Sequence, residues 1–172
     1  TGWNASGDIA TTSKEVDATF ASTGVTKSCP KAILLYTGTA DFTGSTDIAT
    51  VQSNYKALVD KVKSKASGAK IYVMSLHGRY NNASLNTGRM TTLNNWLRDE
   101  LAGNAGYENV KFIDTYAATI GTDNNPVADY VNSNNYLTGK GSVKFAQAIR
   151  DALSADFNDV SFTVLTDEQA AE

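Results

Sequence analysis

Side chains that can do chemistry stand directly after two apolar runs of the sequence. Asp41 follows the first run through a turn at Gly38, and His77, Arg79 and Tyr80 follow the second. In open α/β sheets, ligands bind in the crevice outside the carboxyl ends of the strands. If both runs are strands, we expect Asp41, His77, Arg79 and Tyr80 to line such a crevice.

The acid-base chemistry available at this crevice is limited. His77 is the only histidine of the chain, and an imidazole is the most frequent general base in enzymes. A hydrogen-bonded loop histidine is the alternative, because no motif places a serine and an acid beside it. Five aspartates are candidate Ca²⁺ ligands, but the Asp-x-Asn-x-Asp-Gly spacing is absent, so loop capping is the simpler interpretation: Asp41, Asp47, Asp114, Asp123 and Asp129. We expect no metal and no cofactor.

The length and charge of the chain restrict its function further. A chain of 172 residues buries a sizeable core as one domain, and we expect a single domain over 1–158 with a strand and tail over 159–172. Charged residues make up 19% of the sequence and the formal net charge is −3. This balance argues against nucleic-acid or anionic-membrane binding, which needs a concentrated basic face. No apolar stretch approaches the roughly 20 residues of a membrane span.

The composition favours a neutral partner, such as carbohydrate or protein, and an extracellular or virion surface. The sequence is rich in Thr, Ser, Asn and Gly, and its one cysteine, Cys29, excludes an intramolecular disulfide. Four tyrosines fall on or near predicted loops, where their rings can stack on sugars: Tyr80, Tyr116, Tyr130 and Tyr136. Half-buried packing is the alternative for these rings.

The apolar spacing predicts strands that alternate with helices. In 47–66 an apolar stripe recurs at the helical period, and the run 32–36 is typical of a strand buried on both faces. The predicted elements are helices over 13–23, 47–66, 90–103 and 141–153, and strands over 32–36, 70–76 and 110–114. This order predicts an α/β fold of three layers, α/β/α, with a mainly parallel, flavodoxin-like sheet. The Asn-rich stretch 123–135 is predicted to be one long loop.

Three short stretches resemble motifs of the SGNH (GDSL-type) esterase and lipase family. Asn4-Ala5-Ser6-Gly7-Asp8 is similar to its second block, which puts Gly7 at the oxyanion-hole glycine. Gly38-Thr39-Ala40-Asp41 is similar to the Gly-x-Asn-Asp block, with Ala40 at the asparagine. Ser133-Asn134-Asn135-Tyr136 is similar to the Asp-x-x-His block before the last helix, with Ser133 at the aspartate and Tyr136 at the histidine. The resemblance covers Asn4 to Leu153 and implies the SGNH-type sheet.

The departures from these motifs imply that catalysis is lost. An alanine at position 40 has no side-chain donor for an oxyanion, and removing one such donor typically costs about 10²–10³ in rate. A phenol such as Tyr136, with an ordinary pKa of about 10, is a poor general base at neutral pH. We therefore expect no catalytic residues, with degenerate catalytic positions at Gly7, Gly38, Ala40, Ser133 and Tyr136.

The family's nucleophile block, Gly-Asp-Ser, has no match upstream of the second block. An alternative alignment puts Gly7-Asp8-Ile9 on that block, with Ile9 at the nucleophile, and it also implies an inactive protein. Near the other end, the run 160–165 and Thr166-Asp167-Glu168 have the form of the family's first strand and turn, without a nucleophile.

This terminal run suggests how the sheet is completed. A parallel sheet that lacks its central strand leaves backbone groups unpaired. We expect the place to be filled by Phe162, Thr163, Val164 and Leu165. The strand folds back in the same chain, or it is donated to a neighbour in a head-to-tail homo-oligomer or filament. An ordinary edge strand is the alternative.

The leading hypothesis is a non-catalytic SGNH-like structural or binding subunit of an extracellular or virion surface assembly. One alternative is a divergent esterase that acts on acylated carbohydrate with His77 as its base. The other is a carbohydrate-binding module that uses the crevice between Gly38 and Tyr136.

Overall fold

The computed structural model describes residues 7–21, 30–42, 47–158 and 166. The predicted α/β class is confirmed: the chain forms a parallel three-stranded sheet flanked by helices. Its residues cluster into two compact units. Unit 1 comprises Thr1–Leu76 and Thr92–Phe112, and unit 2 comprises His77–Thr91 and Ile113–Glu172.

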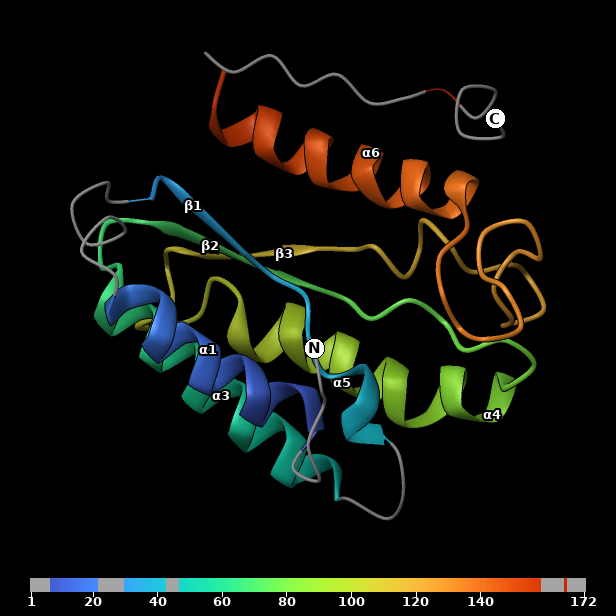
Figure 1. The fold of residues 1–172 in the computed structure, drawn as a ribbon, viewed down its shortest axis with the longest axis horizontal. Helices are drawn as coiled ribbons and strands as arrows, with labels where there is room; N and C mark the ends of the chain where they lie inside the picture. Colours follow the sequence, from blue (N-terminus) through green and yellow to red (C-terminus); the bar gives the residue numbers. More distant parts are fainter. Residues whose placement is uncertain (1–6, 22–29, 43–46, 159–165, 167–172) are drawn as a thin grey trace. The chain divides into compact units, whose positions relative to one another are not determined.

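The sheet has the strand order β1-β2-β3 (Figure 1). The strands are β1 (Ala32–Leu35), β2 (Lys70–Met74) and β3 (Val110–Ile113). β1 runs parallel to β2, with Ala32 opposite Lys70 and Leu35 opposite Val73. β2 lies in the middle and is buried from Ile71 to Met74, as expected for an apolar strand covered on both faces.

β1 corrects one of the predictions. The run 32–36 was expected to be buried on both faces, but Leu34 is 42% exposed, and Ala32 and Ile33 are only half-buried. The reason is position: β1 is the outer strand of the three described strands. An apolar run shows that a strand is at least partly buried, but it does not show whether a further strand covers its outer edge.

The helices of unit 1 pack on one side of the sheet (Figure 1). They are α1 (Gly7–Ala21), α3 (Ile48–Lys65) and α5 (Thr91–Trp96), and the short 3₁₀ turn η1 (Thr39–Phe42) follows β1. The helix predicted over 47–66 is confirmed, and its apolar stripe is buried as expected from helical periodicity: Val51, Tyr55, Leu58, Val59 and Val62. The Tyr55 hydroxyl donates to the carbonyl of Leu35 at 3.3 Å, which ties α3 to β1.

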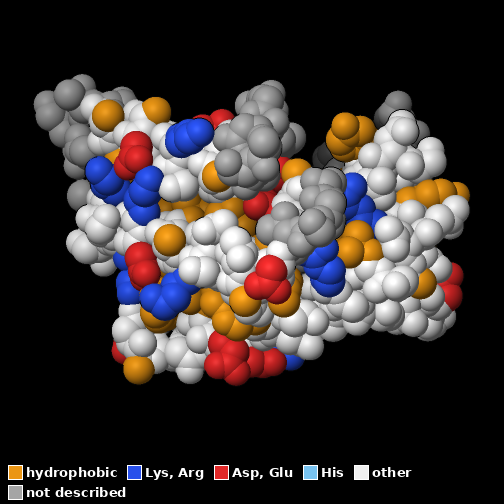
Figure 2. Space-filling model, turned by 90° about the horizontal axis from the view of Figure 1, so that it is seen from below, with side chains coloured by type: hydrophobic (Ala, Val, Ile, Leu, Met, Phe, Trp, Pro, Cys, Tyr) orange, Lys and Arg blue, Asp and Glu red, His pale blue; other side chains and the backbone are white. Residues whose placement is uncertain are grey.

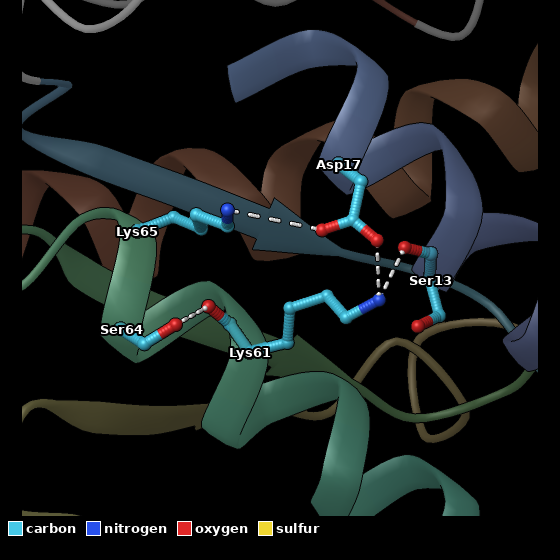
Figure 3. A network of polar contacts seen from close by, with 5 residues as sticks. All are labelled: Ser13, Asp17, Lys61, Ser64 and Lys65. Atoms are coloured by element: carbon cyan, nitrogen blue, oxygen red, sulfur yellow. Dashed lines mark hydrogen bonds and ion pairs between the residues drawn. The ribbon is translucent and has the colours of Figure 1, made fainter. Parts of the chain in front are cut away.

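A polar network joins α1 to α3 (Figure 3). The Lys61 ammonium donates to the carboxylate of Asp17 at 2.8 Å and to the backbone carbonyl of Ser13 at 3.0 Å. Lys65 forms a longer ion pair with Asp17 at 3.9 Å. These side chains are partly exposed, so the network orients the two helices more than it stabilises them.

A second surface cluster also involves α3. Two ammonium groups lie over the Tyr107 ring, Lys63 at 4.1 Å and Lys56 at 5.1 Å from its centroid. The Tyr107 hydroxyl donates to Asp60.

The helix predicted over 90–103 is the second half of a longer, broken helical run. It comprises α4 (Ala83–Leu85), the π-helix η2 (Asn86–Met90), α5 and the π-helix η3 (Leu97–Leu101). The break is at Gly88, whose φ of −94° and ψ of −110° are not helical. The run ends before Gly103, whose φ of +73° favours glycine.

A buried amide anchors this run to the end of β2. The Asn94 side chain accepts from the Leu76 N–H at 3.0 Å and donates to the Leu76 carbonyl at 3.3 Å. The amide thus continues the hydrogen bonding of β2 beyond the sheet, as a neighbouring strand would. Asn94 is 5% exposed, so both bonds are shielded from water.

Unit 2 contains α4, η2, the loops after β3 and the last helix, α6 (Gly139–Asp156). α6 begins two residues before the predicted 141, because the Thr138 hydroxyl caps it by accepting from the Gly141 N–H at 3.1 Å. The backbone carbonyl of Tyr130 occupies the space that a Cβ at position 141 would need, so glycine is required there. Two antiparallel bridges join the loop predicted over 123–135 to residues just outside it, Pro126 to Ile120 and Val131 to Leu137.

The proposed donated strand, Phe162 to Leu165, lies outside the described residues, so strand donation stays a prediction. In the part of the chain that the structure does describe, no helix is both long and apolar enough to cross a membrane.

The Asn94 anchor predicts a specific loss of stability. Asn94→Ala should lower the free energy of unfolding by about 2–3 kcal/mol, because it leaves the Leu76 N–H and carbonyl buried without partners. Urea unfolding followed by circular dichroism measures this change. The neighbouring Asn95 is exposed, and Asn95→Ala should stay within about 0.5 kcal/mol of the wild type. Equal effects of the two variants would contradict the anchor.

Candidate functional site

The residues predicted to form a site occupy two places. Gly7, Gly38, Ala40 and Asp41 lie in unit 1, at the start of α1 and in the turn after β1. The other five positions lie in unit 2, on the segment after β2 and on the loop before α6: His77, Arg79, Tyr80, Ser133 and Tyr136.

In unit 1, two buried carboxylates exchange hydrogen bonds with each other's backbone. Asp41 accepts through one oxygen from the N–H groups of Asp8 at 2.9 Å and Ile9 at 3.2 Å. Asp8 accepts in return from the Thr39 hydroxyl at 2.7 Å and the Ala40 N–H at 2.8 Å. Asp8 is 1% exposed and Asp41 is 6% exposed.

This exchange explains why α1 starts earlier than predicted. Sequence periodicity placed the helix over 13–23, with Ser13 as its cap, whereas it spans Gly7–Ala21. The unpaired N–H groups of a first helical turn need acceptors, and a negative charge is favourable there. Asp41 supplies both from more than thirty residues away, which a local pattern cannot reveal.

The pair is electrostatically costly. Burial raises the pKa of Asp41 above its usual value of 3.8, the hydrogen bond from Ile9 opposes the shift, and the negative charge of Asp8 adds to it. The second oxygen of Asp8, Oδ1, is buried and has no hydrogen-bond partner. Unpaired buried acceptors are rare in native proteins, and among the described residues this oxygen is one that the interior of unit 1 leaves without a donor.

The turn between β1 and η1 depends on Gly38. Its φ is +113°, a conformation that residues with a Cβ rarely adopt. The side chains of Ile9 and Leu76 lie 3.7–3.8 Å from the place of a Cβ, so the requirement is conformational more than steric. The turn directs the backbone N–H of Ala40 toward Asp8.

Ala40, the predicted counterpart of an oxyanion donor, contributes a methyl group and no side-chain donor. Its backbone N–H already donates to Asp8. Ile9, the nucleophile position in the alternative alignment, lies in the first turn of α1 and is 1% exposed. Neither residue can attack a carbonyl carbon or donate through its side chain to an oxyanion.

In unit 2, His77 is buried next to the loop before α6. It is 8% exposed, and its Nε2 lies 3.1 Å from the backbone carbonyl of Asn135. A carbonyl only accepts, so Nε2 carries the proton and the neutral ring keeps its lone pair on Nδ1. Burial lowers the pKa of His77 below 6.5, the bond to Asn135 opposes this, and the charge of Arg79 adds to it.

The segment after His77 is held by a second buried amide. The Asn86 side chain accepts from the Arg79 N–H at 2.6 Å and donates to the carbonyls of Arg79 and Asn124, both at 2.9 Å. Asn86 is fully buried. Its three bonds join the turn after β2 to the loop around Asn124, and they leave the Arg79 side chain half-buried.

The loop before α6 carries the predicted counterparts of the catalytic acid and base. Ser133 is exposed, and Tyr136 is 70% exposed. The Asn132 side chain accepts from the N–H groups of Asn134 and Tyr136 at 2.9 and 3.1 Å. The loop is therefore closed by its own amides, and the tyrosine ring extends into solvent.

No metal site forms among the residues that the structure describes: no group of three or more His, Cys, Asp or Glu side chains is placed to hold an ion. Of the five aspartates considered as Ca²⁺ ligands, two cap turns. Asp114 accepts from the Ala117 N–H at 2.9 Å, and Asp123 accepts from the Asn125 N–H at 3.0 Å.

The comparisons with known proteins agree with this architecture. The family model of the GDSL-like lipase/acylhydrolase family matches residues 3–144. The chain belongs to this family. No curated protein sequence matches it.

Three solved structures share the fold. One is described as a platelet activating factor from Streptococcus pneumonia (TM-score 0.62, 17% identity); the match covers 72% of this chain and 59% of that chain. Another is described as an acylhydrolase from Bacteroides fragilis (TM-score 0.58, 18% identity), and the match covers 74% of this chain and 62% of that chain. The third is the OSK domain of Drosophila Oskar (TM-score 0.57, 13% identity), and the match covers 71% of this chain and 61% of that chain. The chain thus spans about three fifths of the length of these structures.

Sequence reasoning missed the asparagines that hold these loops. Asn86 and Asn94 stand eight residues apart in the broken helical run, both buried, and Asn135 links His77 to Tyr80. A signal was present for Asn94, which interrupts the apolar positions Leu93 and Leu97. A polar residue on an apolar face is often a buried side chain with specific partners.

The charge of Asp41 predicts a pH-dependent difference in stability. An acid whose pKa is raised by folding stabilises the native state below its unfolded pKa, and this contribution is lost as the pH rises through the folded pKa. Asp41→Asn keeps an acceptor for the α1 N–H groups without the charge. As the pH rises from about 3 to about 7, we expect the free energy of unfolding of Asp41→Asn to increase relative to that of the wild type.

Urea unfolding at several pH values measures this difference. The matched variant Asp41→Ala removes the acceptor as well and should lose about 1 kcal/mol or more at all of them. If the free energy of unfolding of the wild type instead increased relative to that of Asp41→Asn as the pH rises, the assigned direction of the pKa shift would be refuted.

The environment of His77 predicts a neutral ring at pH 7. Long-range ¹H–¹⁵N NMR should show the proton on Nε2 and a titration below 6.5. Folding lowers the pKa of His77. Its contribution to stability is therefore present above the pKa of the unfolded state and is lost as the pH falls through the pKa of the folded state. Asn135→Gly keeps the carbonyl and should leave the tautomer unchanged. A ring protonated on Nδ1 at pH 7 would contradict the geometry.

Proposed function

We propose that this chain is a non-catalytic member of the GDSL-like family, which acts by binding or as a structural subunit at an extracellular or virion surface. The main support is Tyr136, which the motif resemblance aligns with the family's catalytic histidine. It is 70% exposed, and a phenol with an ordinary pKa near 10 removes a proton poorly at neutral pH. The scaffold is retained at this position, but the base is not.

Two further positions support the same proposal. Ser133 replaces the acid that would orient a catalytic histidine, and Ala40 replaces an amide donor to the oxyanion. Residues that act as a catalytic unit lose most of the rate when any one of them is removed. Three replacements of this kind argue against acyl transfer at the family's usual positions.

The composition supports a neutral partner. The net charge is −3, and on the face of the molecule in Figure 2 the Lys and Arg side chains alternate with Asp and Glu side chains. Mixed charge of this kind favours neither nucleic acid nor an anionic membrane, since both select a concentrated basic surface.

The second candidate function is a divergent esterase with His77 as its base, and one observation favours it. The ring is buried and neutral, and its Nε2–H is held by the Asn135 carbonyl, which leaves Nδ1 as the basic nitrogen. A general base needs this protonation state. The proposal of a non-catalytic domain requires that no nucleophile uses it.

An activity assay separates the two candidates. The wild type should neither hydrolyse p-nitrophenyl acetate above the buffer rate nor be labelled by a fluorophosphonate probe, because no activated serine is available. Turnover or labelling that disappears in His77→Ala and persists in Asn95→Ala would overturn the proposal in favour of the esterase. Thermal melting of His77→Ala and of the closer replacement His77→Gln establishes that a loss of signal is not a loss of fold.

A further inference from the structure

We propose that unit 2 binds neutral carbohydrate on a surface formed by Tyr80, Asn81, Asn134 and Tyr136, hereafter the tyrosine surface. This inference rests on the proposed non-catalytic function and names its ligand class. Two of the largest exposed apolar side chains of the described chain belong to it: Tyr136 at 70% and Tyr80 at 38% exposure. Asn81 and Asn134 are exposed beside them in sequence.

One asparagine links the two halves of the tyrosine surface. The side-chain oxygen of Asn135 accepts from the Tyr80 N–H at 2.8 Å, and its backbone carbonyl accepts from His77 at 3.1 Å. Tyr136 is the next residue along the chain. Two turns that are more than fifty residues apart in sequence are thereby brought side by side within one unit.

The turn that carries Tyr80 is rigidly held. Asn86 binds both the N–H and the carbonyl of Arg79, and the Asn82 N–H donates to the same carbonyl at 3.3 Å. Asn81 has a φ of +49°, a conformation that asparagine tolerates better than most residues. The backbone of this turn is thus occupied by internal hydrogen bonds, which leaves the side chains to face a ligand.

The turn that carries Tyr136 is equally constrained. The Asn132 N–H donates to the Tyr136 carbonyl at 2.9 Å, and the Asn135 N–H donates to the Asn132 carbonyl at 2.9 Å. The bridge between Val131 and Leu137 closes the base of the turn. Asn135 has a φ of +65°, so its left-handed conformation sets the position of the tyrosine that follows.

These side chains match the chemistry of a neutral sugar. A pyranose ring has apolar C–H faces and a rim of hydroxyl groups. A tyrosine ring offers an apolar face with a polar tip, and an asparagine amide both donates and accepts hydrogen bonds. None of the four residues of the tyrosine surface is charged, and Arg79, which precedes Tyr80 in the same turn, is half-buried.

The rigidity of the two turns supports binding over a packing role. Tyrosine has few rotatable bonds, and a backbone that is already ordered loses little entropy when a ligand binds. An exposed ring without such support is common on protein surfaces and carries no implication. Here four asparagines hold the backbone of the two turns that display the tyrosines: Asn82, Asn86, Asn132 and Asn135.

Affinity electrophoresis in native gels tests the inference. The probes are soluble neutral polysaccharides cast into the gel: arabinoxylan, mixed-linkage β-glucan, galactomannan and glycogen. The wild type should be retarded by at least one of them. Tyr136→Ala and Tyr80→Ala should each weaken binding about tenfold or more, as expected when a central aromatic contact is truncated.

Matched variants separate binding from folding. Tyr136→Phe keeps the stacking ring and should stay within about threefold of the wild type. Tyr107→Ala removes a half-buried tyrosine of unit 1 and should bind like the wild type. Thermal melting of each variant checks that it is folded.

Three results would overturn the inference. One is normal migration of the wild type in all four gels, and another is full retardation of both alanine variants. The third is retardation by heparin alone, because recognition would then depend on charge. Ester hydrolysis by the wild type would instead refute the proposed non-catalytic function, so the two failures are distinguishable.

Discussion

The reciprocal hydrogen bonding of Asp8 and Asp41 is the constraint on which the geometry of unit 1 depends. Each carboxylate accepts from the backbone of the segment that carries the other, so the start of α1 and the turn after β1 hold each other in place. The arrangement also consumes the backbone N–H of Ala40. This N–H therefore donates to a buried carboxylate of the fold.

The sequence predicts those parts of the structure that depend on local spacing. α3 and β2 were located within one or two residues, because a long apolar stripe or run is decisive by itself. The start of α1 and the exposure of Leu34 were not predictable in this way. The first depends on an acceptor supplied from Asp41, and the second depends on the position of β1 at the outside of the sheet.

The assignment of Gly38, Ala40 and Tyr136 to a site rests on motif spacing and stays a prediction. The hydrogen-bond partners of their segments could not be read from the sequence. The asparagines escaped notice, because a polar residue in an Asn-rich chain looks like part of a solvated loop. These asparagines instead join segments that are distant in sequence. Asn86 and Asn94 use both the oxygen and the nitrogen of their side-chain amides, and Asn135 uses its backbone carbonyl and its side chain. Such roles depend on tertiary contacts and leave little local pattern.

The close approach of Gly141 to Tyr130 has a consequence for how this protein can diverge. Since the first turn of α6 leaves no room for a side chain at 141, the attachment of the preceding loop to the helix tolerates almost no substitution. The tip of that loop is under no comparable steric limit. Natural variation should therefore concentrate in the exposed side chains of the loop, Ser133 and Asn134, while the glycine at 141 is retained.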